Sequence, residues 1–119
     1  MRLLIVDDSP VACEMVRRLL EGAADVEVVG TAGSGAEGLE ACAALTPDIV
    51  VMDWSMPGMS GIDATAEVRR RHPEIEVVAF TSTREREVHD AFLAAGATAV
   101  LAKDRALELR DHLLRVAAR

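Results

Sequence analysis

The sequence is poor in aromatic residues, with one Trp, two Phe and no Tyr among its 119 residues. A core therefore has to be built from aliphatic side chains, and 50% of the residues are hydrophobic. Buried parallel strands rich in Val, Ile and Leu, covered by Ala- and Leu-rich helices, suit such a composition. The composition favours an α/β protein.

The sequence also has only two cysteines, no net positive charge and no long apolar run. Cys13 and Cys42 are too few and too far apart for a disulfide framework or a zinc site, which indicates small buried thiols in a reducing cytoplasm. The net charge of −7 argues against direct contact with nucleic acid or anionic membranes, because phosphate contacts need Lys and Arg. No apolar run reaches the ~18 residues of a membrane span. We expect a cytoplasmic protein that suits a cation or a basic partner.

Short apolar segments alternate with longer helical patterns along the chain. The expected strands are Leu3–Val6, Val26–Gly30, Ile49–Met52, Val77–Phe80 and Ala99–Ala102. The expected helices run from Pro10 after a Ser9 cap, from Ser34 to about Leu45, from Ser60 or Gly61 to His72, through Val88–Ala95 to a stop at Gly96, and from Asp104 onward. This order predicts a parallel sheet with helices on both faces, in one domain.

Several local features have structural explanations. Val11, Met15 and Leu19 fall on one face of the first expected helix. Asp104 is expected to cap the last helix, and Thr81 or Ser82 is a candidate cap for the fourth. The glycines between residues 30 and 38 are expected in turns and helix packing, and the arginines at 69–71 in solvent at a helix end. The histidines at 72, 89 and 112 have no ligand spacing and are expected to have no role in a site.

Polar side chains stand where the expected strands end. Asp7 and Asp8 follow the first strand, Asp53 the third, Thr81 ends the fourth and Lys103 follows the fifth. The carboxyl ends of strands in a doubly wound sheet meet at one edge, where ligands bind. Three acids gathered there would repel one another without a cation. A hard ion with oxygen ligands, Mg²⁺ or Mn²⁺, fits this set.

Such a site is suited to phosphoryl chemistry. A carboxylate can attack phosphorus and form an aspartyl phosphate, provided that the charge of the phosphoryl oxygens is neutralised. A metal held by Asp8 and Asp53 and the ammonium of Lys103 would supply this neutralisation, while Thr81 would donate its hydroxyl.

Four segments carry a family resemblance, which extends over essentially the whole chain. They are IVDDSP, DIVVMDWSMPGMSG, VVAFTS and AAGATAVLAKD. Together they resemble the receiver domains of two-component response regulators, including the chemotaxis regulators. The resemblance implies a flavodoxin-like (βα)5 fold over residues 1–119, with a doubly wound, five-stranded parallel sheet of order 2-1-3-4-5.

The resemblance also implies roles for the site residues. Asp53 is similar to the phosphoacceptor, and Asp7 and Asp8 are similar to the acids that hold Mg²⁺ together with Asp53 and the carbonyl of Ser55. Thr81 and Lys103 match the residues that contact the phosphoryl group.

The same resemblance implies partners and a signalling role. The phosphoryl donor would be a sensor histidine kinase or a phosphotransfer protein. The output would be altered binding to a downstream effector protein or domain, or homodimerisation. The domain would catalyse its own phosphorylation and dephosphorylation rather than act as a multiple-turnover enzyme.

One departure leaves alternatives open. Val100 stands where the family often has Tyr or Phe, so an aromatic switch cannot operate. A receiver-like interaction module that takes no phosphate is therefore an alternative. An aspartate-nucleophile phosphohydrolase would need an acid at Ser55, and a flavodoxin-type flavin protein would need more aromatic residues than this chain has.

Overall fold

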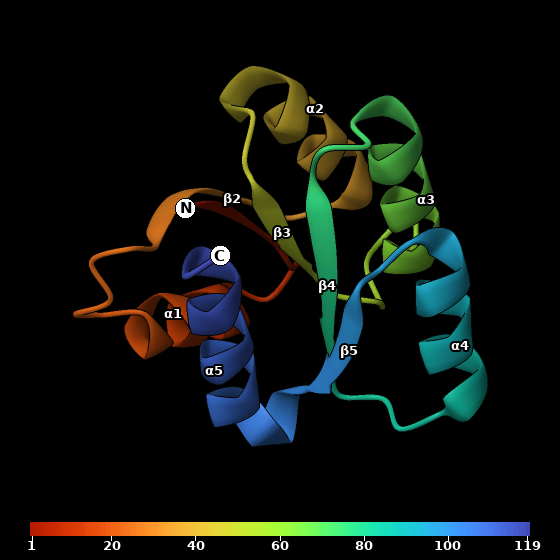
Figure 1. Cartoon of the computed structure of the whole chain (residues 1–119). Coiled ribbons are helices and arrows are strands. Elements are labelled where there is room, and N and C mark those ends of the chain that lie inside the picture. The colour runs from red at the N-terminus through yellow and green to blue at the C-terminus, as the bar shows by residue number, and fades with distance from the viewer.

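The computed structural model describes all 119 residues, in which strands and helices alternate (Figure 1). The strands are β1 (Arg2–Val6), β2 (Glu27–Ala32), β3 (Ile49–Met52), β4 (Glu76–Thr81) and β5 (Ala99–Ala102). The helices are α1 (Pro10–Leu19), α2 (Gly35–Leu45), α3 (Gly61–Arg71), α4 (Arg86–Ala95) and α5 (Ala106–Ala117), with a 3₁₀ turn, η1 (Lys103–Arg105), before α5. The expected alternation is confirmed. No helix is long and apolar enough to cross a bilayer.

The five strands form one parallel sheet in the order β2-β1-β3-β4-β5. This is the predicted order. Figure 1 shows α1 and α5 on one face of the sheet and α2, α3 and α4 on the other. Strand order reverses between β1 and β3, so the carboxyl ends of these two strands flank the switch point where ligands bind in such sheets.

Helices cover both faces of the sheet, and successive residues of a strand point to opposite faces. Each strand therefore contributes side chains to both halves of the core. In β3, Val50 and Met52 join the cluster under α2, α3 and α4, whereas Ile49 and Val51 join the cluster under α1 and α5. Each of these side chains is at most 2% exposed. The end of β3 is therefore held rigidly from both sides.

Three helices begin at serine caps, of which the cap at Ser9 was predicted. The hydroxyls of Ser9, Ser34 and Ser60 accept bonds from backbone N–H groups three residues ahead, at 3.1–3.2 Å. Such bonds satisfy otherwise unpaired donors of the first turn. At the other end of α4, Gly96 adopts a left-handed φ of 111°, as expected for its C-terminal stop.

Two other expected caps are wrong. The N-terminal cap residue of α4 is Glu85, not Thr81 or Ser82, and no side chain caps that helix. Asp104 does not cap α5 either, because it lies inside η1 and its carboxylate pairs with Arg84. A long-range ion pair has replaced the local capping bond at this position.

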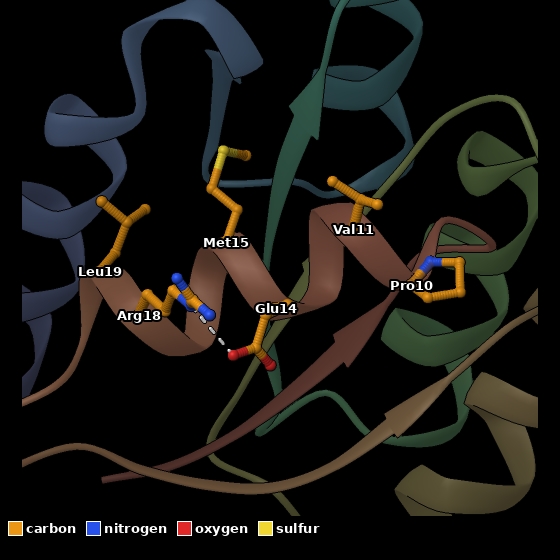
Figure 2. Close-up of a pocket in the computed structure, with 6 residues that line it drawn as sticks. All are labelled: Pro10, Val11, Glu14, Met15, Arg18 and Leu19. Atoms are coloured by element: carbon orange, nitrogen blue, oxygen red, sulfur yellow. Dashed lines mark hydrogen bonds and ion pairs between the residues drawn. The ribbon is translucent and has the colours of Figure 1, made fainter.

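Only part of the predicted apolar stripe of α1 faces the core, because Met15 and Leu19 are half-buried against the cluster whereas Val11 is exposed. Ala12 and Val16 contact the core, whereas the side of the helix that carries Val11 borders an open groove (Figure 2). Val11 itself is 79% exposed. Pro10, Glu14, Met15, Arg18 and Leu19 line the rest of this groove.

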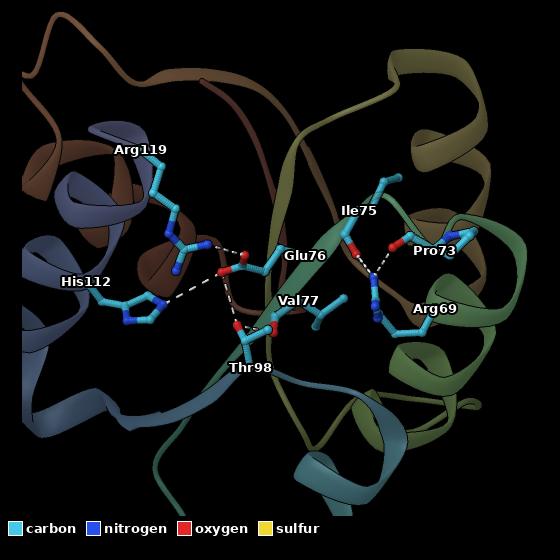
Figure 3. A network of polar contacts seen from close by, with 8 residues as sticks. All are labelled: Arg69, Pro73, Ile75, Glu76, Val77, Thr98, His112 and Arg119. Carbon is cyan, nitrogen blue, oxygen red and sulfur yellow. Dashed lines mark hydrogen bonds and ion pairs between the residues drawn. The ribbon is translucent and has the colours of Figure 1, made fainter.

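Polar contacts stabilise the end of the sheet at which β4 begins (Figure 3). Glu76 accepts hydrogen bonds from Thr98 and Arg119, each at 3.1 Å, and His112 Nε2 lies 3.9 Å from the same carboxylate. These contacts tie the end of α5 to the sheet.

The arginines at the end of α3 do not all have the solvent role expected of them. Arg69 is half-buried, and its guanidinium donates to the carbonyls of Pro73 and Ile75 at 2.6 and 2.5 Å (Figure 3). Arg70 and Arg71 pair with Glu67 on the surface. Arg69 therefore holds the connection between α3 and β4.

Candidate functional site

Three carboxylates meet at the carboxyl ends of β1 and β3. The backbone N–H of Asp7 donates to Ala32 and that of Asp53 donates to Val6, each at 2.9 Å, so both positions continue the sheet. Asp7 and Asp53 are buried, at 6% and 7% exposure, while Asp8 is exposed. One oxygen from each acid lies within 4.8 Å of the others. The sequence places these acids at separate strand ends, and the fold brings them together.

Lys103 joins this group from the end of β5. Its Nζ lies 2.7 Å from Asp7 Oδ2 and 3.3 Å from Asp53 Oδ1, and its side chain is only 20% exposed. The ammonium therefore bridges the two buried acids. One cation faces three carboxylates, which leaves the site with an excess of negative charge.

Burial and charge shift the protonation of the bridging pair. Burial raises the pKa of Asp53, and the neighbouring Asp7 raises it further, against the opposing effect of Lys103. Burial alone would lower the pKa of Lys103, but its hydrogen bond to Asp7 and the charges of Asp53 and Asp7 outweigh burial and raise the pKa. Lys103 is therefore held in its charged form, and the charge on Asp53 is costly to keep.

Asp7 and Asp8 differ in what their side chains can reach. Asp7 Oδ1 accepts a bond from the Ser9 N–H at 2.9 Å, and its other oxygen binds Lys103, so both of its oxygens have protein partners. Asp8 borders a hollow that is also lined by Glu14 and Arg17. Asp7 thus anchors the site, whereas Asp8 offers an accessible oxygen at its mouth.

The loop after β3 is held against the site by Gly61. The Gly61 N–H donates to the Trp54 carbonyl at 2.8 Å, and the hydroxyl of the buried Thr65 donates to the Gly61 carbonyl at 2.7 Å. A Cβ atom at Gly61 would lie 1.7 Å from the backbone oxygen of Asp53. Met56 anchors the loop in the core. The supporting roles of Gly61 and Thr65 were not predicted, although the glycine that closes the loop motif marks the position.

The remaining expected site residues lie near the same edge. Thr81 is buried, at 2% exposure, at the end of β4, where it pairs in register with Ala102 of the neighbouring β5. Its hydroxyl accepts a bond from the Thr83 N–H at 3.3 Å and has a hydrogen left to donate. Ser55 is exposed in the loop after Asp53. Val100 is half-buried against the cluster under α4.

The donor set fits a hard divalent cation. The three grouped ligand candidates all present carboxylate oxygens, and none is His or Cys. Mg²⁺ and Mn²⁺ prefer such oxygen ligands, and Mg²⁺ commonly keeps several waters, for which the open side at Asp8 leaves room. A cation there would also offset the excess negative charge.

The family follows from the fold, the site and a direct comparison of sequences. The family model for the response regulator receiver domain matches residues 3–114. The chain belongs to this family, the receiver domains of two-component systems.

Particular relatives agree with this assignment. Response regulator GacA of Pseudomonas viridiflava is 40% identical over 106 residues, which cover 89% of this chain and 50% of GacA. A protein-glutamate methylesterase/protein-glutamine glutaminase of Pseudomonas fluorescens is 42% identical over 96 residues, covering 81% of this chain and 28% of that protein. The chain thus spans half or less of the length of these two relatives.

A solved structure gives the same result for the fold. The signal receiver domain of the putative response regulator NarL from Mycobacterium tuberculosis is 34% identical, with a TM-score of 0.90. The match covers 98% of this chain and 95% of that domain. The present chain is therefore similar to a receiver domain along nearly its whole length.

Proposed function

We propose that this domain accepts a phosphoryl group on Asp53 from a sensor histidine kinase or a phosphotransfer protein, in a Mg²⁺-dependent reaction. The observation that carries the proposal is the position of Lys103, whose ammonium binds Asp7 and Asp53 at once while Asp8 remains exposed beside them. Such an arrangement offers a nucleophile, a fixed cation and an open place for a metal in one small region.

Asp8, Asp53 and Asp7 would hold Mg²⁺ or Mn²⁺, with the backbone carbonyl of Ser55 as a further ligand. The bound ion would supply positive charge to the phosphoryl oxygens. The grouping of the three carboxylates supports this role, and their oxygen-only chemistry favours these ions over zinc.

The transfer step follows from the chain's own groups. An oxygen of Asp53 forms a bond to phosphorus as the P–N bond of the donor phosphohistidine breaks, and the bonding electrons remain on the imidazole nitrogen. Lys103 neutralises a phosphoryl oxygen from one side. Thr81 donates its hydroxyl to another from the end of β4. Attack of water on the acyl phosphate later releases phosphate and restores the Asp53 carboxylate.

The phosphorylated state would change binding to a downstream effector protein or domain, or promote homodimerisation. Structural neighbours include a DNA-binding response regulator of the LuxR family from Staphylococcus aureus and the response regulator domain of Thermotoga maritima CheB. Receiver domains therefore occur with different outputs. The net charge of −7 makes direct nucleic acid contact by this chain unfavourable.

Incubation with a small phosphodonor and Mg²⁺, followed by mass measurement of the intact protein, tests the proposal. We expect the mass to increase by one phosphoryl group in the wild type and in Asp111→Asn, which changes an exposed acid on α5. Asp53→Asn should show no increase, and a metal chelator should abolish the increase in the wild type. An adduct of equal yield in Asp53→Asn would contradict the assignment.

A second candidate is an interaction module that takes no phosphate. Val100 favours it, because its aliphatic side chain cannot act as the aromatic switch of many family members. A folded wild-type chain that forms no adduct with any phosphodonor, with or without Mg²⁺, would support this alternative.

A further inference from the structure

The loop between β4 and α4, residues 82–85, is fastened mainly to itself and to α4. The Thr83 N–H donates to Thr81, and the Glu85 N–H donates to Thr83, each at 3.3 Å. His89 Nε2 lies 2.9 Å from the Thr83 carbonyl and ties the loop to the first turns of α4. The loop and the start of α4 therefore form one unit, attached directly to Thr81.

One polar side-chain contact joins this unit to the segment that follows β5. The guanidinium of Arg84 pairs with the carboxylate of Asp104 in η1, twenty residues further along the chain. No other side-chain hydrogen bond or ion pair connects residues 82–85 with β5 or η1. The pair is the single polar link between the two segments.

The two linked segments each carry a group that the proposed reaction uses. Thr81 immediately precedes the loop, and Lys103 immediately precedes Asp104. Lys103 itself points inward to Asp7 and Asp53, while the side chain of Asp104 is 55% exposed and is paired with Arg84. The negative charge of Asp104 is therefore neutralised by Arg84, and Lys103 remains free for the buried acids.

We propose that Arg84 and Asp104 are positioning residues that set the spacing between Thr81 and Lys103 during phosphoryl transfer. The role rests on the function proposed above. Neutralising a phosphoryl group from two sides requires donors that are already in place, because each reorganisation adds to the barrier. A link between the two donor-bearing segments restricts their relative motion before the phosphoryl group arrives.

The expected effect is on rate rather than on folding. Both side chains are largely exposed, and ion pairs of this kind contribute little to global stability. Loss of the link should therefore slow phosphorylation by roughly two- to five-fold, with an unchanged melting temperature. The affinity for Mg²⁺ should not change either, because Asp7, Asp8 and Asp53 are untouched.

A double-mutant cycle tests the link. Initial rates of phosphorylation by phosphoramidate are measured at saturating Mg²⁺ for Arg84→Ala, Asp104→Ala, the double alanine variant and the charge-exchanged variant R84D/D104R. We expect equal losses in the two single variants, no further loss in the double variant, and recovery of the wild-type rate in the exchanged variant. Arg86→Ala and Asp111→Ala provide controls for the change of charge, since both residues are exposed and neither forms an ion pair.

The salt dependence of the phosphorylation rate and the amide hydrogen exchange of residues 82–85 distinguish a positioning role from a general effect on folding. Raising NaCl from about 0.05 M to about 0.5 M should slow the wild type but leave Asp104→Ala nearly unaffected. In the unphosphorylated protein, residues 82–85 should exchange faster in both single variants and at the wild-type rate in R84D/D104R.

The outcomes separate this inference from the proposed function. Single variants that match the wild-type rate, losses that add in the double variant, or unchanged exchange in residues 82–85 would each overturn the positioning role. A wild-type chain that accepts no phosphoryl group would overturn the proposed function, and the positioning role with it.

Discussion

Gly61 lies so close to Asp53 that a Cβ atom at Gly61 would stand 1.7 Å from the Asp53 backbone oxygen. The contact forms because the Gly61 N–H bonds the Trp54 carbonyl and folds the loop back on the end of β3. A glycine at the first position of α3 is thus required by the residue that carries the proposed chemistry. The relationship makes the geometry of Asp53 sensitive to a single methyl group.

Gly61→Ala should destabilise the protein, because the backbone must move to admit the methyl group. The expected loss is about 3 kcal/mol in the free energy of unfolding, at the upper end for overpacking. The measurement is urea unfolding, with Gly33→Ala as the control. A methyl group at Gly33 meets its nearest neighbour at an ordinary 3.5 Å, so the control should change stability little. Equal losses in the two variants would contradict the proposed contact.

Asp53→Asn should stabilise the metal-free protein at pH 7. Burial and the charge of Asp7 raise the pKa of Asp53 despite Lys103, so the folded state disfavours the charged carboxylate. Removing this charge should raise the free energy of unfolding and the melting temperature. The gain should shrink as the pH falls through the raised pKa of the folded state and vanish below the ordinary pKa of 3.8, where the carboxyl group is protonated whether the chain is folded or unfolded.

Asp7→Asn is the contrasting variant for this experiment. It removes the charge that binds Lys103 at 2.7 Å and leaves the ammonium with a weaker partner. We expect it to destabilise the protein at pH 7. A melting temperature of Asp53→Asn below that of the wild type would show that the ion pair with Lys103 outweighs the cost of burial.

Mg²⁺ should change the fluorescence of Trp54 and stabilise the folded chain. Trp54 is the only tryptophan, is half-buried and directly follows Asp53, so its emission reports on this site alone. Millimolar Mg²⁺ should alter the emission and raise the melting temperature by mass action. Asp8→Asn should weaken both responses by roughly ten-fold in Mg²⁺ concentration, whereas Asp111→Asn should leave them unchanged. An unaltered Trp54 signal at saturating Mg²⁺ would argue against a metal beside Asp53.

His112 lies at the end of the sheet where β4 begins, opposite the Asp53 site. It should make the free energy of unfolding depend on pH. Its Nε2 is buried without a hydrogen-bond partner, and burial lowers the pKa of the imidazole, although Glu76 opposes this shift. Arg115 and Arg119 reinforce the lowering. The unfolded chain therefore binds the proton more readily, so stability is fully present above the ordinary pKa of 6.5 and is lost as the pH falls through the lowered value.

Urea unfolding at intervals between pH 8 and pH 5 measures this dependence. His112→Gln should reduce the loss of stability on acidification, because glutamine does not titrate. A His112→Gln variant with the wild-type slope would assign the acid sensitivity to other groups.

The sequence alone determined the order of strands and helices and the identity of the residues at the strand ends. Short apolar runs, serine caps and glycine stops act through contacts within one or two turns, which are visible in the letters of a short window. For this reason β3 and β5 were predicted residue for residue, and the acids, Thr81 and Lys103 were placed correctly at the ends of their strands. The 2-1-3-4-5 order came from the family resemblance.

Only the tertiary structure decided which of these residues touch. The core selected Ala12 and Val16 of α1 rather than the Val11 side of the helix, because the shape of the facing sheet determines which side of a helix is buried. Asp104 pairs with Arg84 instead of capping α5, because folding brings a partner twenty residues away beside it. Arg69 bonds the carbonyls of the connection to β4 instead of facing solvent, because that connection folds back over it. The close approach of Gly61 to Asp53 depends on the path of a whole loop, which no local pattern encodes.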